Sequence, residues 1–230
     1  MAFDQRIPEG SAVQPNSIAT FARVARLTGR AAAWRLNRLL SDRLPDRPFR
    51  VLDIGTGPAS IPTHLRAFWP KADIVALDIS PEMLQEAVKT DASRGARLRL
   101  LAGDGLHLPF GPAVFDVVVC LFTLHHVDHP EAFLQEACRV LQPSGLLFVL
   151  DFRRDMGRLR FRCFDILWRT IFCLSAGRQG FSESVQSAWR PAEIEALTVE
   201  SRLDTLTVHG TKTELIISNK PPYQRGHNQS

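Results

Sequence analysis

The sequence predicts an α/β protein with a mostly parallel β-sheet that is covered by helices on both faces. Short apolar runs rich in Val, Leu and Ile recur along the chain, and segments with helical spacing of apolar residues lie between them. Buried strands that alternate with helices are typical of such a sheet. With 230 residues, 45% of them hydrophobic, the chain is long enough to bury this core as one domain.

Seven strands are expected. Five parallel strands are predicted at residues 50–54, 73–77, 98–101, 114–120 and 146–150. The stretch LDTLTVHGTKTELIISNK adds an antiparallel hairpin that closes the sheet, with its turn at His209 and Gly210. Helices are expected between the parallel strands at residues 59–68, 81–90 and 130–141. Ser80 suits the N-cap of the second of these helices.

The segments before, within and after the predicted sheet domain are expected to have different roles. An N-terminal extension, residues 1–48, is expected to contain a helix at 17–44 and to precede the main domain at 49–220. Within that domain, residues 153–200 are expected to form a helical lid. The tail at 221–230 is polar and is expected to be disordered.

Composition excludes several classes of protein. The start MAFDQRIPEG lacks the basic end and apolar run of a secretory signal, and no stretch of about 18 uninterrupted apolar residues occurs. The protein is therefore expected to be cytoplasmic. Its four cysteines, Cys120, Cys138, Cys163 and Cys173, have no close CxxC pair and are expected to be reduced core residues rather than metal ligands.

The net charge of +4 is unevenly distributed. Residues 151–180 hold seven arginines and three aspartates, an excess of 7 − 3 = 4 that equals the whole net charge. Nucleic-acid binders more often spread their basic residues over a broad face with interleaved aromatic residues. A nucleic-acid partner is therefore not favoured.

The stretch VLDIGTGPAS places a glycine turn directly after the first predicted strand. Ligands of open parallel sheets bind beyond the carboxyl ends of the strands, and Gly55 and Gly57 let the backbone approach one closely. Asp78 ends the second strand about 20 residues later, the spacing at which a carboxylate accepts both ribose hydroxyls. Asp104 follows the third strand and is placed to reach an adenine amino group. Together these residues predict a nucleoside site.

Asp53 favours a cationic nucleoside ligand over a dinucleotide. A pyrophosphate at the start of the following helix would be repelled by an acid just ahead of the glycines, and Ser60 fills the third glycine position of a dinucleotide motif. A carboxylate at Asp53 suits the ammonium group of an amino acid or a sulfonium.

The stretch LDIGTGPA resembles the first motif of class I S-adenosylmethionine-dependent methyltransferases, with Ala59 in place of the last glycine. The resemblance covers about residues 51–152. The stretch VVVCLFTLHHVDHPEAFLQEACRVLQPSGLLFVLDF is similar to the ubiquinone and menaquinone biosynthesis C-methyltransferases. The family implies a Rossmann-like fold with a seven-stranded, mostly parallel sheet, and S-adenosylmethionine as cofactor.

The same resemblance implies the roles of the cofactor-binding residues. It places the methionine end against Asp53, Gly55, Thr56 and Gly57, the ribose on Asp78, the adenine between Ile79 and Met83 and against Asp104 and Gly105, and the sulfonium near Leu121. For Asp104 a helix N-cap, and for Met83 plain core packing, are the structural alternatives.

Two histidines are candidates for a catalytic base. Methyl transfer itself requires alignment and exclusion of water, and a hydroxyl or acidic carbon acceptor also needs a base. His125 and His126 follow the fourth strand at the predicted catalytic edge, and imidazole suits this role near neutral pH. The alternative is that one of them stabilises the loop.

The segment at 158–176 is the main indication of the acceptor. Arg158, Arg162, Asp165 and Arg169 form a polar stripe, and the remaining surface is rich in Phe, Leu, Ile and Trp. Such a face predicts burial in the core or in a homodimer, contact with a membrane surface, or closure over a lipophilic molecule.

The sequence thus predicts an S-adenosylmethionine-dependent methyltransferase that acts on a small, apolar or lipophilic acceptor, as a monomer or homodimer. A non-catalytic S-adenosylmethionine-binding protein and an NAD-linked oxidoreductase are the alternatives, and Asp53 and Ser60 oppose the second.

Overall fold

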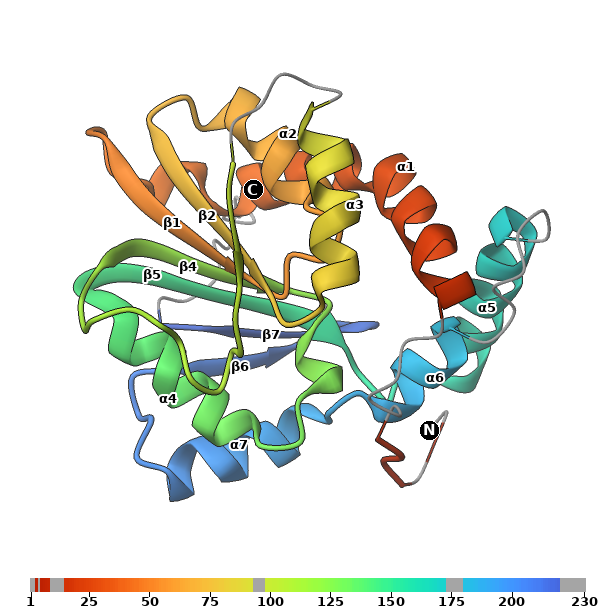
Figure 1. Cartoon of the computed structure of the whole chain (residues 1–230). Coiled ribbons are helices and arrows are strands. Elements are labelled where there is room, and N and C mark those ends of the chain that lie inside the picture. Colours follow the sequence, from red (N-terminus) through yellow and green to blue (C-terminus); the bar gives the residue numbers. More distant parts are fainter. Residues whose placement is uncertain (1–2, 4, 9–14, 93–97, 173–179, 220–230) are drawn as a thin grey trace, which may run out of the picture.

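The computed structural model describes residues 3, 5–8, 15–92, 98–172 and 180–219 (Figure 1). Its centre is a seven-stranded sheet with the order β3-β2-β1-β4-β5-β7-β6. The strands are β1 (Phe49–Ile54), β2 (Ala72–Asp78), β3 (Arg99–Ala102), β4 (Phe115–Leu121), β5 (Leu141–Phe152), β6 (Thr207–Gly210) and β7 (Glu214–Ser218). Strands β1 to β5 are parallel, and β7 runs antiparallel to both of its neighbours. The predicted fold class is confirmed.

Helices cover both faces of the sheet (Figure 1). On one face lie α1 (Pro15–Leu40), α2 (Ser60–Phe68) and α3 (Pro81–Ala92), and on the other lie α4 (Pro130–Val140) and α7 (Pro191–Glu200). Helices α5 (Arg158–Phe172) and α6 (Gly180–Ser187) lie beside the carboxyl ends of the strands. Two 3-10 turns, η1 (Ser41–Arg43) and η2 (Leu124–His126), follow α1 and β4.

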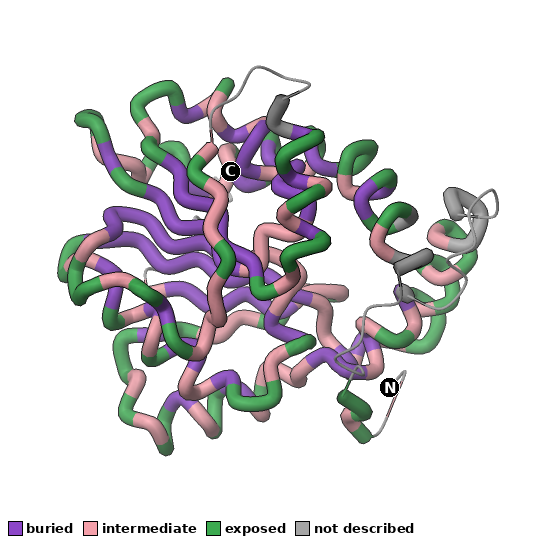
Figure 2. Tube along the Cα trace, in the orientation of Figure 1, coloured by how far each residue is buried: buried purple, intermediate pink, exposed green. Residues whose placement is uncertain are grey.

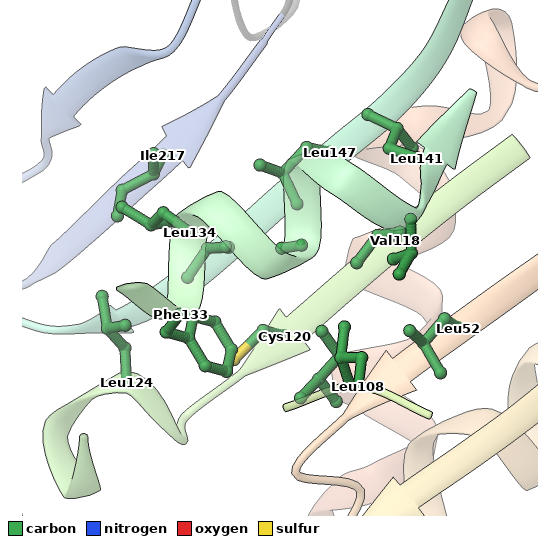
Figure 3. Packing of buried hydrophobic residues seen from close by; sticks show 14 of the residues in the cluster. Leu52, Leu108, Val118, Cys120, Leu124, Phe133, Leu134, Leu141, Leu147 and Ile217 are labelled. Atoms are coloured by element: carbon green, nitrogen blue, oxygen red, sulfur yellow. The ribbon is translucent and has the colours of Figure 1, made fainter. Parts of the chain in front are cut away.

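Each face of the sheet carries its own hydrophobic core, because the central strands are buried on both sides (Figure 2). Figure 3 shows the core under α4, where Phe133 and Leu134 pack against side chains of β1, β4, β5 and β7. On the opposite face, Leu36 and Leu40 of α1 and Leu65 of α2 pack against the sheet. The two cores fix the sheet, and with it the turns at its carboxyl edge.

Local signals set several element boundaries. The Ser80 hydroxyl accepts a hydrogen bond from the Met83 amide at 3.2 Å, so the predicted N-cap of α3 is confirmed. The predicted turn at His209 and Gly210 is wrong, because both residues lie in β6 and the chain reverses over residues 211–213. Gly210 instead allows a close approach, since a Cβ there would lie 2.5 Å from the Arg153 guanidinium.

The cysteines are only partly in the core. Cys120 is buried and Cys138 is half-buried, whereas Cys163 is exposed on α5. The prediction of a core position is therefore wrong for Cys163, because α5 turns that side chain away from the protein. Cys173 lies outside the described residues.

Candidate functional site

The sheet reverses its strand order between β1 and β4, and the turn after β1 lies at this switch point. Gly55 has a φ of 73° and Gly57 a φ of 55°, in the left-handed region that favours glycine. A Cβ on Gly55 would lie 2.2 Å from a methyl carbon of Thr123, so this position also excludes any side chain. The backbone amides of Gly55 and Thr56 both donate to the Leu77 carbonyl, at 2.8 and 3.0 Å.

Ala59 occupies the third special position of the same turn. It has a φ of 52° and ψ of 29°, a left-handed conformation that costs a non-glycine residue roughly 1–2 kcal/mol. The turn thus keeps its backbone path although alanine replaces the glycine of the motif.

Asp53 is a buried carboxyl group at the end of β1. It accepts a hydrogen bond from the Thr56 hydroxyl at 2.7 Å. The pKa of Asp53 is raised to about 7, because burial and, less strongly, the nearby Asp78 carboxylate outweigh the lowering effect of the Thr56 hydrogen bond. A cation placed beside Asp53 would stabilise its ionised form.

Asp78 joins the end of β2 to the glycine turn. Its Oδ2 accepts from the Gly57 amide at 2.6 Å, and its Oδ1 accepts from the Ser80 amide at 2.9 Å. Burial raises the pKa of Asp78, and these two hydrogen bonds oppose that shift. Because a carboxylate has about four acceptor sites, the backbone amides leave acceptor capacity for a further hydroxyl donor.

Asp104 and Gly105 follow β3 but are shaped mainly by local packing. Oδ1 of Asp104 accepts from the Leu106 amide at 2.9 Å, and Oδ2 lies 3.4 Å from Nδ1 of His107. Asp104 therefore closes its own turn and remains half-exposed. A Cβ on Gly105 would lie 2.7 Å from the Phe133 ring, so the core itself requires this glycine.

The three apolar residues predicted at the site differ in their exposure. Ile79 is exposed beside Asp78, and Met83 is buried in the first turn of α3. Leu121, at the end of β4, lines a small hollow between the sheet and α1 with Leu36 and Phe148. Among these three, only Ile79, next to Asp78, has an exposed side chain.

His125 and His126 have different environments in η2. His125 is buried, and its Nδ1 lies 2.7 Å from Oδ1 of buried Asp151 at the end of β5. The His125 backbone amide also donates to Asp151 Oδ2 at 2.8 Å. His126 is exposed, and its ring centroid lies 4.1 Å from that of His125. Asp151 thus anchors the loop through both the ring and the backbone amide of His125.

Sequence reasoning missed three contributors to this edge. Asp151 is followed directly by Phe152, and its partner His125 lies 26 positions earlier in the chain, so no local motif signals the pair. Thr123 donates to the Gly55 carbonyl at 3.0 Å and connects η2 to the glycine turn. Phe21 of α1 lies over the turn, where a Cβ on Gly57 would be 3.4 Å from its ring. Among these contacts, only the one made by Thr123 had a local sequence signal, which was the glycine at position 55.

Arg6 ties the start of the chain to the same loop. Its guanidinium donates to the carbonyls of His125 and Val127, both at 3.2 Å, and to the Ser187 carbonyl at 2.7 Å. The same group lies 4.2 Å from the ring centroid of Trp189 and pairs with Asp128. The N-terminal segment therefore stabilises the histidine loop against α6.

Within the described residues, no cluster of three or more His, Cys, Asp or Glu is arranged to hold a metal ion. Likewise, none of the helices in the described parts of the chain is both long and apolar enough to cross a membrane.

Comparison with known proteins gives matches that span this edge of the sheet. Residues 52–149 match the family described as methyltransferase domain. The demethylmenaquinone methyltransferase of Thermus thermophilus is 37% identical over 119 residues, which are 52% of this chain and 54% of that protein. A ubiquinone/menaquinone biosynthesis C-methyltransferase of Pseudomonas putida is 26% identical over 179 residues, 73% of this chain and 70% of that protein.

A solved structure shows the same fold. A SAM-dependent methyltransferase from Aquifex aeolicus superposes with a TM-score of 0.61 at 18% identity, over 90% of this chain and 98% of that one. The chain spans about half the length of the Thermus relative and of the Deinococcus radiodurans relative, at 54% and 49%. The match at residues 52–149 begins within β1 and ends within β5, so it includes Asp53 and Asp78 at the carboxyl ends of β1 and β2 and Asp104 after β3.

Proposed function

Because residues 52–149 form a methyltransferase domain on a class I methyltransferase fold, we propose that the protein transfers a methyl group from S-adenosylmethionine to a small lipophilic acceptor. The observation that carries this proposal is the pair of buried acids beside the glycine turn. Asp53 and Asp78 lie at the ends of neighbouring strands, where one suits a cation and the other retains acceptor capacity for hydroxyls.

The residues present fit this cofactor. Asp53 and the turn of Gly55, Thr56 and Gly57 would hold the methionine end, and Asp78 would accept the ribose hydroxyls. The exposed side chain of Ile79 and the buried Met83 would flank the adenine.

Asp104, Gly105 and Leu121 are assigned to the outer parts of the same site. Asp104 is half-exposed and would reach the adenine edge beside Gly105. The backbone of Leu121, rather than its side chain, would pass near the sulfonium, because the side chain lies toward α1.

The cofactor supplies an activated methyl group, so the protein has to orient the acceptor, exclude water and remove a proton where the acceptor needs it. We assign the proton transfer to His126, which is exposed at the edge of the sheet. His125 is bonded to Asp151 and would position the loop. Its ring supports that of His126 at a centroid distance of 4.1 Å.

The acceptor is proposed to be lipophilic for two reasons. Two of the relatives are named as a demethylmenaquinone methyltransferase and as a ubiquinone/menaquinone biosynthesis C-methyltransferase. In this chain, the lid proposed at residues 153–200 would consist of α5 and α6, since α7 packs on the sheet, and the apolar residues of α5 are largely exposed. We also propose that residues 1–48 form an extension and that residues 49–220 form the main domain. The protein is proposed to be cytoplasmic and to act as a monomer or homodimer. Contact of residues 158–176 with a membrane surface would bring it to acceptors dissolved there.

Two measurements test the proposed function. Isothermal titration should show binding of S-adenosylmethionine and S-adenosylhomocysteine and no binding of NAD. A methyl-labelled donor, incubated with the protein and lipid extracts, should then give labelled organic-soluble product. Binding without transfer to any acceptor would instead favour a non-catalytic binding protein, and binding of NAD alone would contradict the proposal.

A further inference from the structure

Helix α5 has two apolar faces, and the inner one is explained by the fold. Phe161, Phe164 and Trp168 recur at helical spacing and surround the buried ring of Phe181 in α6, at centroid distances of 6.0, 6.3 and 5.5 Å. Phe152 at the end of β5 contacts the same ring at 5.4 Å. This aromatic cluster attaches α5 to the carboxyl edge of the sheet.

The outer face of α5 is apolar and exposed. Leu159, Ile166 and Leu167 are 76%, 64% and 56% exposed, and Cys163 lies between them. With about 100° of rotation per residue, these four side chains share one side of the helix, opposite the aromatic residues. In Figure 2 the free side of α5 is coloured exposed, away from the sheet. Three large exposed apolar side chains on one short helix face indicate an interaction surface.

Arginines flank this outer face. Arg158 and Arg162 lie along one edge of it and Arg160 along the other, and all three are exposed. The nearby Arg153 and Arg154 are used internally, because they pair with Asp155 and Glu193. Three of the arginines at residues 151–180 therefore lie exposed around the apolar stripe.

We propose that the outer face of α5 docks on the surface of an anionic lipid bilayer. An apolar stripe between rows of arginine is the pattern by which an amphipathic helix lies in a membrane interface, with cations at the headgroups. A second copy of the chain fits less well, because a symmetric contact would bring the same arginines together. The docking surface consists of Leu159, Cys163, Ile166 and Leu167 with Arg158, Arg160 and Arg162.

This inference rests on and sharpens the membrane contact included in the proposed function, and its test is independent of methyl transfer, since vesicle binding is measured without cofactor or acceptor. The test is flotation of the full chain with vesicles of phosphatidylcholine, alone or mixed with phosphatidylglycerol. We expect binding to the mixed vesicles, weaker binding to neutral ones, and a loss of binding as salt is raised. Changing Leu159, Ile166 and Leu167 together to Ser should weaken binding to mixed vesicles by more than about tenfold.

The arginines are tested separately. Arg160→Gln combined with Arg162→Gln should weaken binding to mixed vesicles by about fivefold per arginine and leave the weak binding to neutral vesicles unchanged. Matched controls are Val88→Ser with Val199→Ser, at positions 57% and 72% exposed on α3 and α7, and Arg30→Gln with Arg202→Gln outside α5. The controls should bind vesicles as the unchanged protein does.

Several results would overturn the inference. These are no binding to mixed vesicles, equal binding by the Ser variant and its control, or equal affinity for neutral and anionic vesicles. A change from dimer to monomer in the Ser variant, without a change in vesicle binding, would assign the face to a second copy instead. Unchanged thermal stability and S-adenosylhomocysteine affinity would show that each variant is folded.

Discussion

The carboxyl edge of the sheet and helix α5 are built in opposite ways. At the edge, polar groups are buried and held by specific partners, as Asp53 is by Thr56 and Asp78 by two backbone amides. On α5, Leu159 and Ile166 are apolar and exposed. Buried carboxylates are costly unless a ligand or hydrogen bond compensates them, and exposed apolar groups are costly unless a surface covers them. The two regions therefore suit different partners, a cation at the edge and an apolar phase on α5.

The comparison also shows which features can be predicted from sequence. The glycine turn and its acids follow from a local motif, since Asp53, Gly55 and Gly57 lie within five residues. The two faces of α5 do not, because periodicity identifies apolar positions without saying which side meets Phe181. Substitutions at the carboxyl edge of the sheet should therefore change cofactor binding, and substitutions on the outer face of α5 should leave cofactor binding unchanged.

The largest effect is expected at Asp78. Asp78→Ala would remove the acceptor of two ribose hydroxyls and of the Gly57 and Ser80 amides. We expect a loss of about 2 to 4 kcal/mol in S-adenosylmethionine binding, more than tenfold in Kd by titration calorimetry. Asp73→Ala, at the opposite end of β2, is the matched control and should bind normally. An unchanged Kd in folded Asp78→Ala would remove the ribose assignment.

Substitution of His125 should mainly lower stability, and substitution of His126 should mainly lower turnover. His125→Ala would leave buried Asp151 without its ring partner and should lower the free energy of unfolding by about 1 to 3 kcal/mol. His126→Gln, at an exposed position, should change stability by less than about 0.5 kcal/mol. It should lower kcat, keep the S-adenosylmethionine Kd and remove the acidic limb of the pH profile.

Denaturation and kinetics on both variants check this pair. Normal turnover in His126→Gln would exclude His126 as the base. Equal losses of stability and activity in both variants would mean that the loop is only structural.

The pairing of His125 with Asp151 marks a limit of sequence-based prediction. The fourth strand was predicted to within one residue, whereas β5 begins at Leu141, five residues before the predicted start, and extends past the predicted end to include Asp151. The contact between His125 and Asp151 depends on the register of β4 against β5, which aligns Leu121 with Leu150 and so brings the two strand ends together. Likewise, the sequence does not show that the Leu121 side chain lies toward α1, because that depends on the pleat of β4. Nor does it show that Gly210 allows Arg153 to pack closely and does not form the turn.

Cofactor affinity should depend on pH through Asp53. The pKa of Asp53 is raised to about 7, so protons compete with a cationic ligand below that pH. The Kd for S-adenosylmethionine should rise as pH falls below 7, by up to about tenfold per unit, until it reaches that of Asp53→Asn. Titration of both proteins at several pH values checks this. The same slope in Asp53→Asn would assign the effect to another group.

The Asp53 carboxyl should also affect stability. Its folded pKa lies above the unfolded value of 3.8, so its favourable contribution is present at low pH and lost as pH rises through 7. Asp53→Asn should therefore raise Tm at pH 8 relative to the unchanged protein, and the difference should shrink toward pH 4. A difference that grows toward low pH would contradict the assigned shift.

The smallest effect is expected at Phe21, where α1 covers the glycine turn. An aromatic ring beside a sulfonium contributes about 0.5 to 1 kcal/mol at an exposed site. Phe21→Leu keeps apolar bulk, so it should weaken binding of S-adenosylmethionine by a few-fold and that of the uncharged sulfide of S-adenosylhomocysteine by less. Equal changes for both ligands would show that only packing is involved.

Hydrogen exchange with mass spectrometry tests the contrast between the two regions most directly, because it reports both in one protein. In the free protein, we expect fast exchange across residues 161–172 and slow exchange in β4. Adding S-adenosylhomocysteine should slow exchange at residues 55–60 and 78–84 and leave α5 unchanged until a hydrophobic acceptor or anionic vesicles are added. Protection of α5 as deep as that of β4 in the free protein, or no protection of the glycine turn by S-adenosylhomocysteine, would contradict the account.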